Sequence, residues 1–170
     1  RIGQGIAKRA LGFGMNVIYH NRSHLSDADE KACGAKYVSK EELLRTADHV
    51  VLVLPYSAQS HHTIGAKEIA LMKPTATLIN IARGGIVDDE ALAQALKEKK
   101  IFAAGLDVFE GEPKVHPELL KLSNVVLAPH IASATEKTRR AMVDLAIENV
   151  VVALSGKKPP SLINAEVFKG

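Results

Sequence analysis

Short apolar runs rich in β-branched residues alternate along the chain with longer stretches whose apolar positions follow a helical period. The apolar runs predict strands at Asn16–His20, His49–Pro55, Thr77–Ala82, Ala103–Val108 and Val125–Pro129. Most of these runs are apolar throughout rather than alternating, which is typical of strands covered on both faces. Repetition of strand, helix and strand at this spacing predicts an α/β fold with a doubly wound parallel sheet.

Polar residues in front of the helical stretches indicate where helices begin. Ser39 and Ser133 each stand three residues before a glutamate, the capping-box pattern of a helix N-terminus. Asp88 or Asp89 is expected to cap another helix, whose lysine-rich last turn suits a helix C-terminus. The long helix after Ser133 is expected to stop at Gly156.

The chain opens on glycines and a helix start, with no strand before them. In a dinucleotide-binding fold the central strand comes immediately upstream of such a turn. We therefore expect a fragment that begins inside the phosphate-binding turn, leaves a gap in the middle of its sheet, and is poorly folded or inactive alone. Residues 1–156 are assigned to a truncated dinucleotide-binding domain and residues 157–170 to a linker and C-terminal tail, with the substrate domain absent from this sequence.

Composition and charge narrow the class of protein. Hydrophobic residues make up 46% of the 170, enough to bury a core, and a net charge of +3 without a Lys/Arg run predicts no nucleic-acid partner. No apolar run is long enough to predict a membrane span, so no membrane partner is expected. Cys33 is the single cysteine and is expected to be inert, which favours a reducing, cytoplasmic setting.

The first predicted strand ends in a turn that bears on nucleotide choice. In dinucleotide-binding folds an acid at this place hydrogen-bonds the ribose 2′-hydroxyl of NAD, whereas a neutral or basic group accommodates the 2′-phosphate of NADP. Asn21 stands where the acid is expected, and Arg22 and Ser23 follow it. Because a guanidinium can pair with a phosphate through two hydrogen bonds, the turn predicts a preference for NADP(H), with NAD(H) as the alternative.

Three charged side chains each come just after a predicted strand. Arg83 is followed by two glycines, Glu112 stands in a Glu-Pro pair, and His130 follows Pro129. A guanidinium can hold a carboxylate through two parallel bonds. A carboxylate beside an imidazole orients it and favours its protonated form, so that it can donate a proton near neutral pH. Together these residues predict a catalytic site.

Three segments resemble the hallmark segments of the D-isomer-specific 2-hydroxyacid dehydrogenases: Ile79–Leu92, Ala103–Pro113 and Pro129–Thr135. Within this family the chain looks closest to the branch of glyoxylate/hydroxypyruvate and 2-ketogluconate reductases. The resemblance implies a Rossmann-like domain of an oxidoreductase that acts on a small 2-keto or 2-hydroxy acid and dimerises when full-length. It also implies that Arg83 binds the substrate carboxylate and that His130 is the acid/base with Glu112 as its partner, while the rival acid Glu110 lies off the family position.

The resemblance further implies which residues contact the cofactor. Asp107 would meet the nicotinamide amide, and Arg83 and His130 would contact the cofactor as well as the substrate. The remaining implied contacts are Arg1, Ile2 and Gly3 at the pyrophosphate, Leu54 and Pro55 at the adenosine pocket, and Ile81, Ala82, Ala132 and Ser133 beside the nicotinamide.

Two other functions fit the same fold. One is an NAD-linked 3-phosphoglycerate dehydrogenase, against which the turn beginning at Asn21 argues. The other is a nucleotide-sensing module like the corepressors that share the fold, against which the set of Arg83, Glu112 and His130 argues. The adjacent His61 and His62 are expected to point apart on the surface, and no spacing predicts a metal site. The apolar face of residues 142–154 is expected to pack in a core or between domains.

Overall fold

The computed structural model describes residues 1–168 and divides the chain into two compact units at Pro129. The first unit, Arg1–Pro129, is an α/β body that carries all the strands of the described chain. The second unit begins at His130 and contains the long helix α6 (Glu136–Leu154) and a short 3₁₀ turn at Ala165–Val167. The predicted domain limit at residue 156 stays a prediction.

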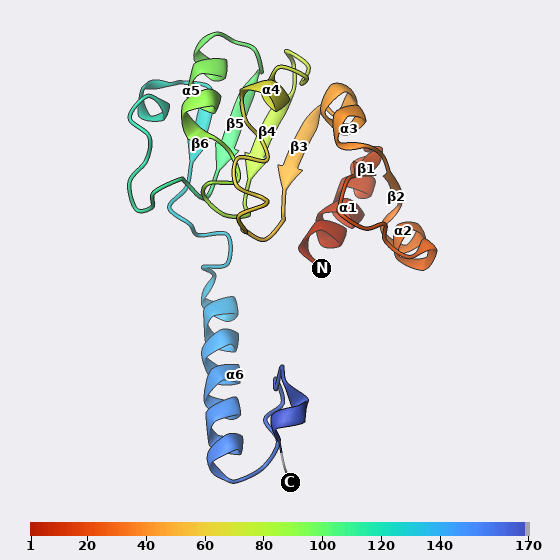
Figure 1. Cartoon of the computed structure of the whole chain (residues 1–170), viewed down its shortest axis with the longest axis vertical. Coiled ribbons are helices and arrows are strands. Elements are labelled where there is room, and N and C mark those ends of the chain that lie inside the picture. Colours follow the sequence, from red (N-terminus) through yellow and green to blue (C-terminus); the bar gives the residue numbers. More distant parts are fainter. Residues whose placement is uncertain (169–170) are drawn as a thin grey trace. The chain divides into compact units, whose positions relative to one another are not determined.

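The strands of the first unit form two separate parallel sheets. Strand β1 (Val17–Tyr19) pairs with β2 (Ala35–Tyr37), with Val17 opposite Ala35. The other sheet has the order β3-β4-β5-β6, built from β3 (His49–Leu52), β4 (Thr77–Asn80), β5 (Ala103–Leu106) and β6 (Val125–Leu127) (Figure 1). Among residues 1–168 no ladder joins β1 to β3. The predicted α/β fold with a parallel sheet and a break in that sheet is therefore confirmed.

Helices connect successive strands, as parallel pairing requires. They are α2 (Asp27–Cys33), α3 (Lys40–Thr46), α4 (Ala66–Ile69) and α5 (Asp89–Lys97), and a 3₁₀ turn at Leu119–Lys121 lies between β5 and β6. Helix α1 (Ile2–Gly12) precedes β1. Two predicted helix starts are confirmed, because Ser39 accepts the amide of Glu42 and Asp88 accepts the amide of Ala91.

The predicted start of the last helix is wrong by two residues. Thr135, and not Ser133, is the N-cap of α6, and its hydroxyl accepts the amide of Thr138 at 3.3 Å. Ser and Thr are both good N-caps, so the capping-box spacing alone does not choose between them. The end of the helix is close to the expected place: its last residue is Leu154, and Gly156 has a left-handed φ of 74°.

The core of the first unit lies between α3 and the turn before β6. Buried apolar side chains from Leu44 to Leu119 form one cluster. The sheet contributes Leu78 from β4 and Leu106 from β5, and both side chains are buried. Helix α5 contributes Leu92 and Leu96, both almost completely buried. The cluster includes no residue before Leu43, so β1 and β2 lie outside it.

The apolar side chains of α6 are exposed within the described structure, for example Met142 at 60% and Leu154 at 84%. The expectation that this face packs in a core or between domains stays a prediction. No helix within residues 1–168 is long and apolar enough to cross a membrane.

Candidate active site

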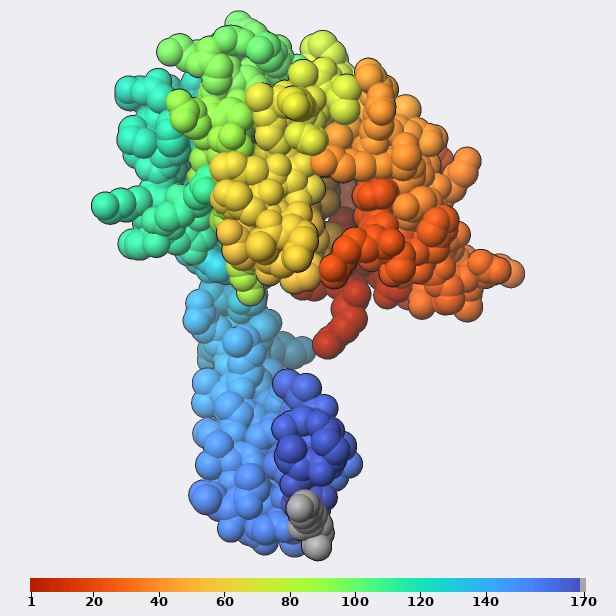
Figure 2. Space-filling view, in the orientation of Figure 1, coloured from red at the N-terminus to blue at the C-terminus, as the bar shows by residue number. Residues whose placement is uncertain are grey.

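A pocket of about 740 Å³ lies in the first unit, where β3, β4 and β5 end. Its wall consists of residues that follow these three strands and of one residue from the start of α1. They are Ile2, Val53, Leu54, Pro55, Tyr56, Ile81, Ala82, Arg83, Gly84, Gly85, Phe109, Glu110, Gly111 and Glu112. The volume suits a small-molecule ligand, and the carboxyl ends of parallel strands are where such folds bind ligands. The space-filling view shows this unit hollowed between the red and orange atoms around β1 and β2 and the yellow atoms that follow β3 (Figure 2).

A buried asparagine builds the turn that carries Arg83. Asn80, at the end of β4, is only 1% exposed, and its side-chain oxygen accepts the amide of Ala82 at 3.1 Å. Its side-chain nitrogen donates to the carbonyl of Arg83, also at 3.1 Å. The turn is therefore fixed from inside and presents Arg83 to the pocket. Sequence reasoning missed this role, although one amide at the end of an otherwise apolar run was the available signal.

Replacing Asn80 with alanine is expected to destabilise the protein. The change leaves the amide of Ala82 and the carbonyl of Arg83 without their partner in a buried turn, which costs about 1–3 kcal/mol for each unsatisfied group. The free energy of unfolding, measured by urea denaturation, should fall by at least about 1 kcal/mol. Asn16→Ala, at an exposed position before β1, is the matched control and should change it little. Equal stability of the two variants would contradict the role given to Asn80.

The turn after Arg83 packs directly on the segment that carries Glu110 and Glu112. A Cβ atom placed on Gly84 would lie 1.8 Å from the carbonyl oxygen of Phe109 and 2.4 Å from its carbonyl carbon. Only a residue without a side chain allows two backbones to approach in this way. Gly84 thus fixes the distance between the arginine and the two glutamates.

Two carboxylates and one backbone amide hold the segment after β5 in place. Glu112 accepts the amide of Phe109 at 3.0 Å, and Asp89 accepts the amide of Glu110 at 2.9 Å. Burial raises the pKa of Asp89, against the opposing effect of its hydrogen bond to the Glu110 amide. Asp107 is buried, and its amide donates to the carbonyl of Asn80 at 3.0 Å. The segment is therefore tied both to the N-terminus of α5 and to β4.

The structure places the predicted cofactor and catalytic residues in different parts of the chain. The pocket wall includes Ile2, Leu54, Pro55, Ile81, Ala82, Arg83 and Glu112, and does not include Arg1, Gly3, Asn21, Arg22, Ser23 or Asp107. The exposed turn Asn21–Ser23 follows β1, where the hydroxyl of Tyr37 donates to the carbonyl of Asn21 at 3.5 Å. His130, Ala132 and Ser133 belong to the second unit. The roles given to all these residues stay predictions.

The start of α1 fits a phosphate group. Ile2 is both the first residue of this helix and part of the pocket wall, and Arg1 is exposed beside it. Among residues 1–168 no side chain caps this N-terminus. Uncapped amides at a helix N-terminus, together with the helix dipole and a guanidinium, favour an anion. The pyrophosphate of a dinucleotide is an anion of this kind.

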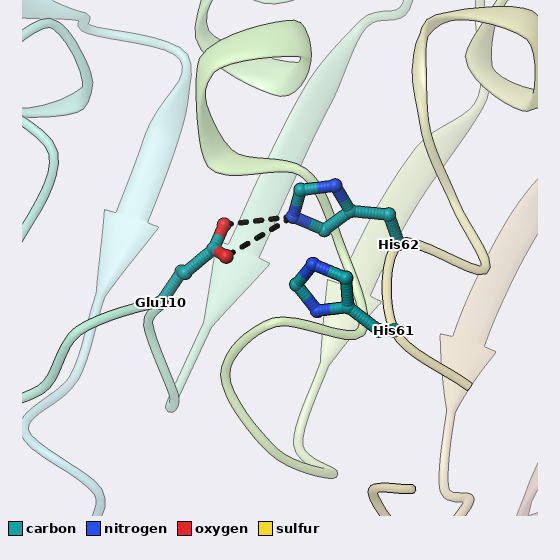
Figure 3. Close-up of side chains that lie close together, drawn as sticks. All are labelled: His61, His62 and Glu110. Carbon is teal, nitrogen blue, oxygen red and sulfur yellow. Dashed lines mark hydrogen bonds and ion pairs between the residues drawn. The ribbon is translucent and has the colours of Figure 1, made fainter. Parts of the chain in front are cut away.

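The two adjacent histidines do not point apart, so that expectation is wrong. The rings of His61 and His62 stack with their centroids 3.8 Å apart and their planes at 22° (Figure 3). Side chains of neighbouring residues diverge on a regular strand or helix, but His62 has a φ of 48°, in the left-handed region. This turn brings both rings to one side, where His62 Nε2 lies 2.9 Å from a carboxylate oxygen of Glu110 (Figure 3).

Comparisons with known proteins agree with the fold. Residues 1–132 match the family model described as "D-isomer specific 2-hydroxyacid dehydrogenase, NAD binding domain". A glyoxylate reductase of Thermococcus onnurineus is 51% identical over 168 residues, which are 99% of this chain and 50% of that protein. The chain spans about half the length of the curated relatives it matches.

Solved structures of enzymes named as glyoxylate reductases are similar to this chain in fold. A glyoxylate reductase from Paecilomyes thermophila has a TM-score of 0.88 at 41% identity and matches 97% of this chain and 50% of its own. An NADPH-dependent glyoxylate/hydroxypyruvate reductase from Sinorhizobium meliloti, solved with NADP and malonate, has a TM-score of 0.84 at 37% identity. That match covers 91% of this chain and 47% of the other. The Rossmann-like character of the first unit follows from these similarities together with its parallel strand order.

Proposed function

Because the chain belongs to the D-isomer-specific 2-hydroxyacid dehydrogenase family, we propose that it takes part in hydride transfer between NADP(H) and a small 2-keto or 2-hydroxy acid such as glyoxylate or hydroxypyruvate. One observation carries the proposal: Arg83 lies with Glu110 and Glu112 on the wall of a single pocket whose other residues are mostly apolar. An apolar pocket with a few charged groups is typical of a small-molecule site, and the guanidinium is the group in it that can hold an anionic substrate.

Arg83 is proposed to hold the substrate carboxylate. Its exposed guanidinium stands at the end of β4 in the turn fixed by Asn80, so it can offer two parallel hydrogen bonds to a carboxylate. Holding the acid group orients the neighbouring carbonyl, and orientation of this kind accounts for much of the rate gain in reactions between bound partners.

The nicotinamide cofactor supplies the hydride when it is bound, and the residues of this chain orient the reactants and move the proton. In the reductive direction His130 is proposed to donate a proton to the carbonyl oxygen of the substrate. Glu112 is proposed to hold the imidazole of His130 in position and to favour its protonated form. We further propose that the enzyme acts as a homodimer in the cytoplasm.

Cofactor choice is proposed to depend on the turn after β1. Asn21→Asp should shift preference from NADPH toward NADH, because a carboxylate repels the 2′-phosphate and accepts a hydrogen bond from the 2′-hydroxyl. In the full-length enzyme the ratio of kcat/KM for NADPH to that for NADH, measured with glyoxylate and hydroxypyruvate, should fall by at least about tenfold, since like-charge contacts cost several kcal/mol.

Asn16→Asp makes the same charge change at the other end of β1 and serves as the matched control. It should leave the ratio unchanged. A wild-type protein that already prefers NADH would contradict the proposed cofactor. Nucleotide binding without turnover of either keto acid would instead favour a non-catalytic, nucleotide-sensing role.

A further inference from the structure

We propose that His61, His62 and Glu110 form a binding site for a divalent transition-metal ion at the rim of the pocket. Each residue offers one ligand atom, and the three atoms all lie within 4.8 Å of one another. Figure 3 shows the two imidazole rings stacked and facing the carboxylate of Glu110. The histidines precede α4 and the glutamate follows β5, so an ion would link two loops that are far apart in the sequence.

Each histidine has one ring nitrogen near an oxygen atom of another residue. His61 Nδ1 lies 3.3 Å from the hydroxyl of Tyr56, and His62 Nδ1 lies 3.9 Å from a carboxylate oxygen of Asp88. Histidines that bind a metal commonly engage their second nitrogen with a nearby oxygen, which fixes the ring and the tautomer. In His62 this leaves Nε2 directed at Glu110, at 2.9 Å.

The backbone around the histidines is fixed by hydrogen bonds. The amide of His62 donates to the carbonyl of Gly85 at 2.8 Å, and the amide of Ile64 donates to the carbonyl of Ile86 at 3.1 Å. The hydroxyl of Ser60, itself buried, accepts the amide of Ser57 and donates to the carbonyl of Pro55. A ligand set on such a loop loses little freedom when an ion binds.

Charge and access both favour a cation. Glu110 and Asp88 lie against His62, so two carboxylates flank its ring. The side chains of His62 and Glu110 are 36% and 40% exposed, which leaves room for an ion to enter from solvent and for water to complete its coordination.

The ligand types determine which ions fit. Two imidazole nitrogens and one carboxylate oxygen suit Zn²⁺, Co²⁺ or Ni²⁺, whereas Mg²⁺ and Ca²⁺ prefer sites made of oxygen. Bonds of about 2.0–2.1 Å in a tetrahedral site place neighbouring ligand atoms about 3.4 Å apart. The separation of 2.9 Å between His62 and Glu110 is close to this value, and side-chain rotation of His61 can supply the remaining adjustment.

The test uses Co²⁺ as a spectroscopic probe and Zn²⁺ as a competitor. Purified protein freed of metal by a chelator is titrated with Co²⁺ while the visible absorption is followed, and heat is measured during a separate titration with Zn²⁺. Wild-type protein should bind one ion per chain and show the intense visible bands of four- or five-coordinate Co²⁺, which one equivalent of Zn²⁺ should abolish.

Three variants and one control identify the site. His61→Ala, His62→Ala and Glu110→Gln should each weaken binding by at least about tenfold, a loss expected even for residues that only support metal ligands. His49→Ala removes an exposed histidine at the other end of β3 and should leave binding unchanged. Circular dichroism of each variant checks that the fold is kept.

His61→Ala is the variant least expected to disturb the fold. Among the polar and ring contacts of the described residues, the side chain of His61 contacts those of Tyr56 and His62. Absence of saturable binding in the wild type would overturn the proposal. So would folded His61→Ala and Glu110→Gln variants that bind as tightly as the wild type. In either case His62 and Glu110 form only an ion pair between two loops. None of these outcomes depends on dehydrogenase activity, so the proposed function is tested separately.

Discussion

Substitution of His130 with alanine is expected to lower kcat for reduction of the keto acid by roughly 10²–10⁴-fold, the usual contribution of general acid–base catalysis. The expected reason is loss of the group that gives the substrate oxygen its proton. Steady-state kinetics of the full-length enzyme with NADPH and glyoxylate would measure the change. His49→Ala, which removes a histidine at the start of β3 outside the pocket wall, should retain wild-type kcat.

Glu112→Gln tests the proposed pairing of Glu112 with His130. The substituted amide keeps an oxygen that can accept the Phe109 amide, as Glu112 does now, but it removes the negative charge. An anion near an imidazole favours its protonated form, and reduction needs that form, so the alkaline limb of the rate profile should move to lower pH. Partial activity is expected to remain.

The role of Glu112 is tested by comparing Glu112→Gln with Arg83→Ala and with Glu110→Gln. Arg83→Ala should raise KM for the keto acid and largely spare cofactor binding, which distinguishes a substrate-binding role from an acid–base role. An unchanged pH profile and full activity in Glu112→Gln would show that this carboxylate only holds its loop. Glu110→Gln would then need the same measurement, although Glu110 already pairs with His62 in the structure.

Gly84→Ala is expected to destabilise the protein by about 3 kcal/mol, at the upper end of the range for overpacked sites. The new methyl group would meet the carbonyl oxygen of Phe109 at 1.8 Å, and backbone atoms cannot move aside by changing rotamer. The loop that carries Glu112 must therefore shift away from Arg83. Since misplacement of about 1 Å can cost 10²-fold in rate, kcat should fall as well.

Gly12→Ala makes the same chemical change at the end of α1, where a Cβ would meet nothing within 4 Å. Urea denaturation of both variants measures the difference. The control should be neutral or more stable by up to about 1 kcal/mol, because alanine is the better helix former. Wild-type stability and kcat in Gly84→Ala would show that the two loops can separate without cost.

The main features of the fold were predictable because they depend on buried apolar runs. The strands of the four-stranded sheet were all anticipated, although each ends two or three residues earlier than its apolar run. Strand β2, Ala35–Tyr37, was missed because it is three residues long and contains the exposed Lys36. Helix α4, Ala66–Ile69, is one turn long, too short for a hydrophobic period to be visible.

The candidate site was predictable only where strand ends carry unusual side chains. Arg83 and Glu112 met this condition, and both line the pocket. The supporting residues did not, because the role of Asn80 depends on a turn that closes back on its side chain. The pairing of His62 with Glu110 depends on one left-handed residue and on packing between distant loops, and neither is encoded in sequence spacing.

The separation of the two sheets divides the first unit into regions of unequal local stability. Strands β4 and β5 have ladder partners on both sides and lie in the core, so their amides should open to hydrogen exchange only when most of the unit unfolds. Strands β1 and β2 pair only with each other and contribute nothing to that core, so they can open as a smaller cooperative unit. The turn Asn21–Ser23 belongs to the less stable region formed by β1 and β2. A nucleotide bound at this turn would make the region open less often, by a factor that grows with the nucleotide concentration divided by the dissociation constant.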